Sequence, residues 1–518
     1  MSVLASTSTP LSARARPDAR PDARLDVIEE KIARGERLTI DDGLLLYETP
    51  DVWSVVALAD VVRRRLHGHA AYYNINRHLN YSNVCALSCK FCEFYRKDGD
   101  DGAYTRDMEY IREQARGAVE AGATEIHSVG GLHPSLPFSY YTDLVATIRG
   151  EASRLGSDLH VKAFTAVEIV HLARIAKVYK GATLPGEEGR AARRAGIRHV
   201  LSELKKAGLG SLPGGGAEVF DDRVHDQAYK GKIRSDVWLD VHRVAHELGL
   251  NTNATILYGH IESRIDRLTH MDMLRRAQDE ALARLGYAGV SGRGLAKRSA
   301  AREGKPDTGV GVEDDPGTGE GDLARSEGGH LGARAGEVGD SNAPIITLTR
   351  PGTPLPERVS AADGVGTCPC GYYQTIIPLP FFPDGSELER LPGPSGLENL
   401  RTIAVSRLML DNFPHVKAFW IMQTLPMSQV MLAAGADDID GTVVWYDITK
   451  VNHGAGQGAG AAATNQEVNV WTLRKAIREA GFEPIERDTL YRRVIRDGSN
   501  GRLWRTEPFG VPPAHGIR

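Results

Sequence analysis

Three cysteines lie on one short stretch, Cys85-Ala-Leu-Ser-Cys89-Lys-Phe-Cys92, directly after an apolar run suited to a β-strand. Three thiolates on such a loop can each bind one iron of a cubane iron–sulfur cluster, so that the fourth iron has no protein ligand. Electron-transfer clusters are normally held by four cysteines. The C-x3-C-x2-C spacing therefore predicts that Cys85, Cys89 and Cys92 bind a [4Fe–4S] cluster whose open iron takes part in chemistry.

Two other kinds of site fit the cysteines less well. A zinc site needs a fourth nearby ligand, and no further Cys or His pair follows within the next thirty or so residues. His78 is close, but it precedes the strand. A disulfide framework is not expected in a chain of 518 residues with only 5 cysteines.

Glycine-rich turns follow two other predicted strands. Gly130-Gly131 lies in one, and the run Gly214–Gly216 precedes Glu218 in the other. Paired glycines let a ligand approach the backbone closely, and a glutamate there can accept hydrogen bonds from ribose hydroxyls. A tight turn and a solvated loop remain the alternative interpretations.

Polar residues mark the ends of further strands. Lys162 lies in a strand pattern, where burial requires a partner, so we expect it to bind a substrate carboxylate unless it is exposed at the strand end. Thr165 and Glu168 follow it. Arg407 and Asp411 are spaced i,i+4 on a predicted helix, for which an ordinary surface ion pair is the default.

Tyr258-Gly-His260-Ile-Glu262 closes another predicted strand, and its histidine and glutamate could transfer protons or form a structural pair. Asp440 ends the last predicted strand and is a further candidate for the active site.

Helical and strand patterns alternate over roughly 370 residues, which predicts parallel strands with helical crossovers. About eight strands are expected, so the predicted fold is α/β, a (β/α)8 TIM-type barrel with helical additions at both ends. Predicted strands include 124–129, 159–164, 211–212, 253–258, 374–379, 418–422 and 439–444. Predicted helices include 105–120, 140–155, 197–206, 235–248, 264–285, 397–412 and 427–434.

Composition divides the chain further. Residues 1–25 repeat Ala-Arg-Pro-Asp and predict a disordered tail, and 26–70 is a helical segment. The barrel spans 71–287 and 372–450. Residues 288–371, without any Phe, Trp or Tyr, predict a disordered insertion, and 451–518 form a C-terminal extension.

Charge and hydropathy exclude some partners. The net charge is −4, with 41% hydrophobic and 25% charged residues, which favours neither a nucleic-acid surface nor a membrane footprint. No apolar run approaches the roughly 18 residues of a membrane span. Five cysteines and a tail unlike a targeting helix indicate a reducing, cytoplasmic location.

The cysteine motif, with Phe91 before its last cysteine, resembles that of the radical S-adenosylmethionine (SAM) superfamily. That resemblance implies that the methionine end of SAM chelates the open iron and that reduction releases a 5′-deoxyadenosyl radical. It also implies cofactor contacts by Phe91, Gly130, Gly131 and Glu218, a small-molecule substrate, and a flavodoxin- or ferredoxin-type electron donor.

Within the superfamily, the chain is similar to the aminofutalosine synthases of the futalosine route to menaquinone, over residues 26–287 and 372–495. The motifs that carry this similarity are Val129-Gly-Gly-Leu-His-Pro134, His160-Val-Lys-Ala-Phe-Thr-Ala-Val-Glu168, Thr252-Asn-Ala-Thr-Ile-Leu-Tyr-Gly-His260, Ser406-Arg-Leu-Met-Leu-Asp-Asn-Phe-Pro414 and Glu486-Arg-Asp-Thr-Leu-Tyr491. The tail, the insertion and the segment Lys180–Arg193 depart from the pattern and inherit nothing.

The resemblance implies addition of the adenosyl radical to the vinyl ether of 3-[(1-carboxyvinyl)oxy]benzoate, then rearrangement and loss of carbon dioxide to give 6-amino-6-deoxyfutalosine. Expected catalytic residues are His260, Glu262 and Asp440, and expected substrate-binding residues are His133, Lys162, Thr165, Glu168, Tyr258 and Arg407. Two alternatives remain: a related radical SAM cyclase that acts on dehypoxanthine futalosine by hydrogen abstraction, and a non-catalytic iron–sulfur electron carrier.

Overall fold

Strands and helices alternate along the chain, as the hydrophobic pattern predicts. The computed structural model describes residues 22–287, 290–291, 344–350, 353, 355, 370–443, 467–496 and 504–507. The strands are β1 (Ala70–Asn74), β2 (Asn76–Leu79), β3 (Glu125–Ser128), β4 (His160–Ala163), β5 (Ser211–Leu212), β6 (Asn251–Tyr258), β7 (Val290–Ser291), β8 (Pro344–Ile345), β9 (Tyr373–Pro380), β10 (His415–Val416), β11 (Asp438–Gly441), β12 (Glu483–Glu486), β13 (Arg493–Arg496) and β14 (Trp504–Glu507).

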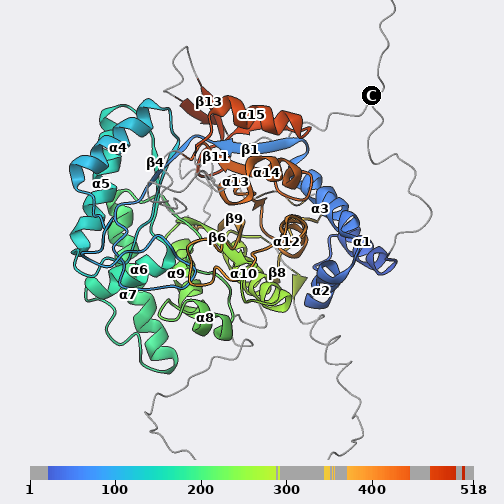
Figure 1. The fold of residues 1–518 in the computed structure, drawn as a ribbon, viewed down its shortest axis with the longest axis horizontal. Coiled ribbons are helices and arrows are strands. Elements are labelled where there is room, and N and C mark those ends of the chain that lie inside the picture. The colour runs from blue at the N-terminus through green and yellow to red at the C-terminus, as the bar shows by residue number, and fades with distance from the viewer. Residues whose placement is uncertain are drawn as a thin grey trace, which may run out of the picture.

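The helices lie around these strands in Figure 1. They are α1 (Arg24–Arg34), α2 (Ile40–Glu48), α3 (Val52–His67), α4 (Met108–Glu120), α5 (Phe138–Arg154), α6 (Ala166–Ile175), α7 (Gly186–Ala207), α8 (Asp222–Ala228), α9 (Ser235–Glu247), α10 (Arg264–Arg284), α12 (Gly396–Met409), α13 (Trp420–Gln423), α14 (Leu425–Leu432) and α15 (Val470–Glu479). None of these described helices offers the apolar length that a bilayer crossing requires.

The parallel strands form a barrel. Seven are hydrogen-bonded in the order β10-β9-β6-β5-β4-β3-β2. β11 extends this order, because Lys417 after β10 bridges to Asp438 and because β11 pairs with β1. β1 leads through Ile75 into β2, which is the last of the seven strands. The circle of strands is therefore closed between β11 and β2. The predicted (β/α)8 barrel is confirmed.

Both ends of the chain pack onto this barrel. The helices α1–α3 lie beside α12 at the right of Figure 1. Arg37, in the loop after α1, joins them to the barrel through ion pairs with Asp279 on α10 (2.5 Å) and with Asp411 just after α12 (3.0 Å). At the other end, β12 pairs with β1 in parallel.

One local prediction is wrong, and some elements were not predicted. The strand predicted at 418–422 is wrong: β10 is shorter and earlier, and Trp420–Gln423 forms α13. The run Phe419-Trp420-Ile421-Met422 is apolar enough for either element, and periodicity cannot separate a buried strand from a short buried helix. The strand β1 and the helix α6 were not predicted.

The structure describes parts of the predicted insertion. β7 and β8 pair antiparallel, with Val290 opposite Ile345. Ile346 and Leu348 are buried against α10. Apart from residues 290–291, 344–350, 353, 355 and 370–371, that insertion lies outside the described residues, as do residues 1–21 of the predicted tail.

Candidate active site

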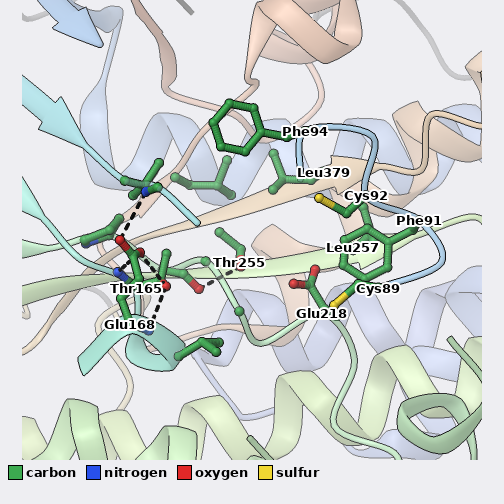
Figure 2. A pocket seen from close by; sticks show the side chains of 18 of the residues that line it. Cys89, Phe91, Cys92, Phe94, Thr165, Glu168, Glu218, Thr255, Leu257 and Leu379 are labelled. Atoms are coloured by element: carbon green, nitrogen blue, oxygen red, sulfur yellow. Dashed lines mark hydrogen bonds between the residues drawn. The ribbon is translucent and has the colours of Figure 1, made fainter. Parts of the chain in front are cut away.

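A cavity of about 370 Å³ lies inside the barrel at the carboxyl ends of the strands, where such barrels place their active sites. Figure 2 shows Cys89, Phe91 and Cys92 on one side of it and Thr165 and Glu168 on the other. The sequence-predicted residues that line it are Cys85, Cys89, Phe91, Cys92, Gly130, Gly131, Lys162, Thr165, Glu168, Glu218 and Asp440.

The cysteine loop presents three free thiols to this cavity. Lys97 holds the backbone of this loop: its Nζ donates to the carbonyls of Cys85, Ala86 and Leu87 at 3.1, 3.3 and 3.0 Å. Thiolate sulfur is the ligand that iron–sulfur clusters use, and the described residues add no fourth cysteine to the cavity lining. The donor set therefore fits a cluster with one open iron.

The glycine pair after β3 allows a close approach of two backbone segments. A Cβ on Gly131 would lie 2.2 Å from the Val84 carbonyl oxygen, and one on Gly130 would lie 2.7 Å from the Tyr81 ring. Gly131 N–H donates to the Ser82 carbonyl at 2.8 Å. Glycine is therefore required here to seat the strand end against the segment that leads into the cysteine loop, as well as to line the cavity.

Glu168 links this glycine turn to helix α6. Its Oε1 accepts hydrogen bonds from the Tyr81 hydroxyl at 2.7 Å and from Gly130 N–H at 3.1 Å. Its Oε2 accepts from the N–H and the hydroxyl of Thr165, both at 2.7 Å, in the capping box that begins α6 (Figure 2). Burial raises the pKa of Glu168, and these four donors oppose that rise by favouring the carboxylate.

Glu218 adopts an uncommon backbone conformation, with φ of 47°. Its Oε1 accepts from Lys232 Nζ at 2.5 Å, and that ammonium group lies 4.9 Å from the centre of the Phe91 ring. Figure 2 shows the Glu218 carboxylate beside Cys89. A strained turn thus holds a carboxylate next to the cysteine loop, where it can accept a hydrogen bond from a ligand.

The floor of the cavity is polar. His78 on β2 pairs in register with His127 on β3, which pairs with Lys162 on β4, so the three side chains come from matching strand positions. Asn253 and Lys417 also line it. Barrel interiors are usually filled by branched aliphatic residues, so a polar layer at this level indicates a polar ligand.

Three buried ion pairs balance the charges around this floor: Lys162–Glu125 (2.6 Å), Lys417–Asp440 (2.9 Å) and Arg487–Asp438 (2.6 Å). Burial lowers the pKa of Lys162, while Glu125 opposes that shift. The expected lysine is therefore at the cavity but already paired, and Asp440 is engaged with Lys417.

Between the floor and the cysteine loop, one wall is apolar. It comes mainly from β6, β9 and the segment after β10, through Leu257, Ile377, Leu379, Phe381, Phe419 and Met422. A ligand with an aromatic ring and a carboxylate would match this wall and floor together.

Three expected residues near the end of β6 are absent from the cavity lining. Glu262 accepts from Gly259 N–H at 2.6 Å and from His260 N–H at 2.9 Å, and it pairs with Arg267 at 2.8 Å. The Tyr258 hydroxyl donates to Asn399 at 2.9 Å. Glu262 and His260 thus belong to the turn into α10, and the Tyr258 hydroxyl bonds to α12. None of the three is in the cavity lining, so the structure gives no support to their expected catalytic and binding roles.

Arg407 is not at the cavity either. It is fully buried and pairs with Asp437, while Asp411 pairs with Arg37, so the default of a surface Arg407–Asp411 pair is wrong. His133, directly after the lining residue Leu132, is itself absent from the lining, and its Nδ1 accepts from Ser135 N–H at 3.3 Å. A helical i,i+4 spacing could not reveal these longer-range partners.

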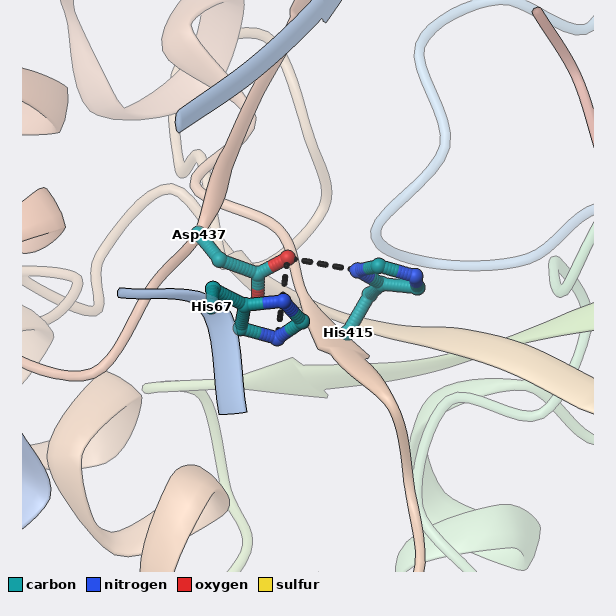
Figure 3. A group of neighbouring side chains, drawn as sticks. All are labelled: His67, His415 and Asp437. Atoms are coloured by element: carbon teal, nitrogen blue, oxygen red, sulfur yellow. Dashed lines mark hydrogen bonds and ion pairs between the residues drawn. The ribbon is translucent and has the colours of Figure 1, made fainter. Parts of the chain in front are cut away.

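Asp437 also joins two histidines, His67 and His415, in a cluster that could in principle hold a metal ion (Figure 3). His415 Nδ1 lies 2.6 Å from Asp437 Oδ2, and His67 Nε2 donates to the Pro414 carbonyl at 2.9 Å. With the Arg407 guanidinium on the same carboxylate, a further buried cation would be repelled. The cluster therefore fastens α3 to β10 and β11.

Sequence reasoning missed His78, His127, Asn253 and Lys417. The alternation of Glu125 and His127 within a four-residue strand was the available signal, because residues i and i+2 of a strand share a face. Burial of that face became evident only with the barrel.

Comparisons with known proteins agree with this architecture. Residues 79–274 match the family model of the radical SAM superfamily, and residues 371–497 match the CofH/MqnC C-terminal region. The crystal structure of methylornithine synthase has a TM-score of 0.51 at 14% identity, covering 88% of this chain and 97% of that one, which supports the fold alone.

Two curated relatives cover nearly the whole chain. An aminodeoxyfutalosine synthase of Thermus thermophilus is 34% identical over 471 residues, 90% of this chain and 95% of the relative. A protein of Methanopyrus kandleri named 5-amino-6-(D-ribitylamino)uracil–L-tyrosine 4-hydroxyphenyl transferase is 28% identical over 463 residues, 88% of this chain and 94% of the relative.

Proposed function

Because the chain belongs to the aminodeoxyfutalosine synthase family of radical SAM enzymes, we propose that it joins the 5′-deoxyadenosyl group of SAM to 3-[(1-carboxyvinyl)oxy]benzoate. Rearrangement and loss of carbon dioxide then give 6-amino-6-deoxyfutalosine. The family implies a [4Fe–4S] cluster and SAM as cofactors. A flavodoxin- or ferredoxin-type protein is the proposed electron donor.

One observation supports this proposal above the others: a single cavity carries three thiols at one end, an apolar wall and a polar floor. The thiol end suits the cluster and SAM. The wall suits the benzoate ring, and the floor suits a carboxylate. A reaction between an adenosyl group and an aromatic dicarboxylate requires the thiol end, the apolar wall and the polar floor, with the wall between the other two.

The residues have separate proposed tasks. Cys85, Cys89 and Cys92 would hold three irons, and Gly130, Gly131, Phe91 and Glu218 would contact SAM. When bound, the reduced cluster and SAM supply the 5′-deoxyadenosyl radical.

The rest of the cavity positions the substrate. The apolar wall excludes water and orients the vinyl ether toward the thiol end, which is where proximity lowers the barrier. Lys162 lies in the floor with its charge balanced by Glu125, and Thr165 and Glu168 hold the glycine turn. His133, Tyr258, His260, Glu262 and Arg407 have no part in the proposed site.

The direct test is anaerobic incubation of the reconstituted, reduced enzyme with SAM and 3-[(1-carboxyvinyl)oxy]benzoate. The expected products are the adenosyl adduct, methionine and carbon dioxide. Free 5′-deoxyadenosine without an adduct would remove the synthase assignment. A parallel reaction with dehypoxanthine futalosine detects the cyclase alternative, for which 5′-deoxyadenosine accumulates with that substrate alone.

A further inference from the structure

His127 occupies the middle of the polar floor, between strands β2 and β4. Its ring lines the cavity and lies 4.6 Å, centre to centre, from the ring of His78. Its Nε2 atom is buried and has no hydrogen-bond partner among the described residues. A polar ring at a ligand cavity with an uncommitted nitrogen can change its protonation state when a ligand binds.

The groups around His127 are already balanced in charge. Lys162 pairs with Glu125, Lys417 with Asp440 and Arg487 with Asp438, so the surrounding charges cancel while both histidines are neutral. A substrate carboxylate that enters this floor adds one negative charge. A buried charge without a counterion is strongly unfavourable, so something near it must compensate.

The free enzyme holds His127 neutral. Burial lowers its pKa well below the usual 6.5, and His78, Lys162 and Lys417 act in the same direction. Glu125, on the same strand, acts in the opposite direction. A ligand carboxylate on the cavity side would add to the effect of Glu125 and place the ring between two anions.

We propose that a carboxylate of the substrate docks on the imidazole of His127 and that one proton enters the floor with it, carried by that ring. The inference rests on the proposed function, because it requires a substrate with a carboxylate. The proton comes from solvent, the carboxylate stays ionised, and no covalent bond changes. His127 thereby becomes a substrate-binding residue whose charge appears only in the complex.

Calorimetry on the reconstituted, unreduced enzyme with SAM present tests this without turnover. Binding of 3-[(1-carboxyvinyl)oxy]benzoate is measured near pH 7.5 in buffers of different ionisation enthalpy. We expect uptake of about one proton per ligand and a Kd that rises up to about tenfold per pH unit. Binding without proton uptake would overturn the inference, and adduct formation by the same preparation after reduction would leave the proposed function standing. If the enzyme neither binds the substrate nor forms the adduct, the inference and the proposed function are both refuted.

Two comparisons locate the proton. His127→Asn should weaken binding and abolish uptake, whereas His199→Asn, at an exposed histidine on α7, should change neither. Full uptake in His127→Asn would assign the proton to another group and refute the proposal. Should that variant fail to fold, carboxamide analogues of each substrate carboxylate serve with the unmodified enzyme. One of the two carboxamide analogues should bind without proton uptake. Proton uptake with both analogues would also refute the proposal.

Discussion

Arg407 and Asp437 form an ion pair in which both side chains are completely buried. The same guanidinium donates to the carbonyls of Gly435, Phe413 and Pro414 at 2.9, 3.3 and 3.2 Å. An arginine that the sequence marked for substrate binding is thus part of the framework that joins α12 to β10 and β11.

Removing one partner of this pair should destabilise the protein. Arg407→Met leaves Asp437 charged and buried, so we expect a loss of about 3–5 kcal/mol in the free energy of unfolding, measured by urea denaturation. Arg34→Met, at an arginine that is 54% exposed, should change it by less than about 0.5 kcal/mol. Unchanged stability with a raised KM would restore the binding role.

Lys97 should stabilise the metal-binding loop. In the unmodified protein the Lys97 ammonium group donates to three backbone carbonyls, and Lys97→Met removes these hydrogen bonds. A hydrogen bond to a charged group contributes about 1.5–3 kcal/mol to stability. We expect iron release from the reconstituted enzyme to a chelator to be roughly tenfold faster. Lys97→Arg should restore most of the retention.

The matched control for that experiment is Lys90→Met, at an exposed lysine of the same loop. Its iron release should match that of the unmodified enzyme. Equal rates for Lys97→Met and Lys90→Met would show that the loop keeps its shape without the Lys97 contacts.

Glu168→Gln should disturb the glycine turn. Each carboxylate oxygen of Glu168 now accepts hydrogen bonds, one from Tyr81 and Gly130 and the other from Thr165. The amide of glutamine has only one acceptor oxygen, so its NH₂ group would face one of these sets of donors. We expect the free energy of unfolding to fall by about 1–3 kcal/mol and SAM binding, measured by equilibrium dialysis, to weaken. Glu120→Gln, at an exposed position on α4, is the control, and an unchanged SAM Kd in Glu168→Gln would contradict the prediction.

Glu125 should make stability depend on acid pH. Burial opposes its ionisation, yet the charges of Lys162, Lys417 and Arg487 hold its pKa below the usual 4.5. A carboxyl whose folded-state pKa is depressed contributes stability that is complete above the unfolded pKa and is lost as pH falls through the folded one. Below about pH 4.5 the unmodified protein should therefore lose stability more steeply than Glu125→Gln.

Urea midpoints measured from pH 7 to pH 3 check this difference. Glu120→Gln should run parallel to the unmodified protein over the whole range. If the curve of Glu125→Gln is also parallel, the Lys162–Glu125 pair does not contribute to the pH dependence.

Much of the fold and part of the site were predictable because they depend on local patterns. The spacing of Cys85, Cys89 and Cys92 places three thiols on one loop whatever the rest of the chain does. Helical periodicity and glycine stops defined most of the barrel helices, and strand–helix alternation implied parallel strands. The glycine pair comes just after one predicted strand and Glu168 lies a few residues after another, so their place at the carboxyl end of the barrel was also predictable.

The partners of the charged residues depended on the tertiary structure. Arg407 finds Asp437 rather than Asp411, and Lys162 finds Glu125 on the neighbouring strand, because closing the barrel decides which faces become interior. His127 and His78 meet through strand register, which no local pattern specifies for four-residue strands. Sequence thus determined which reactive groups exist and in what order, whereas long-range packing in a low-dielectric interior decided which of them are paired and which face the cavity.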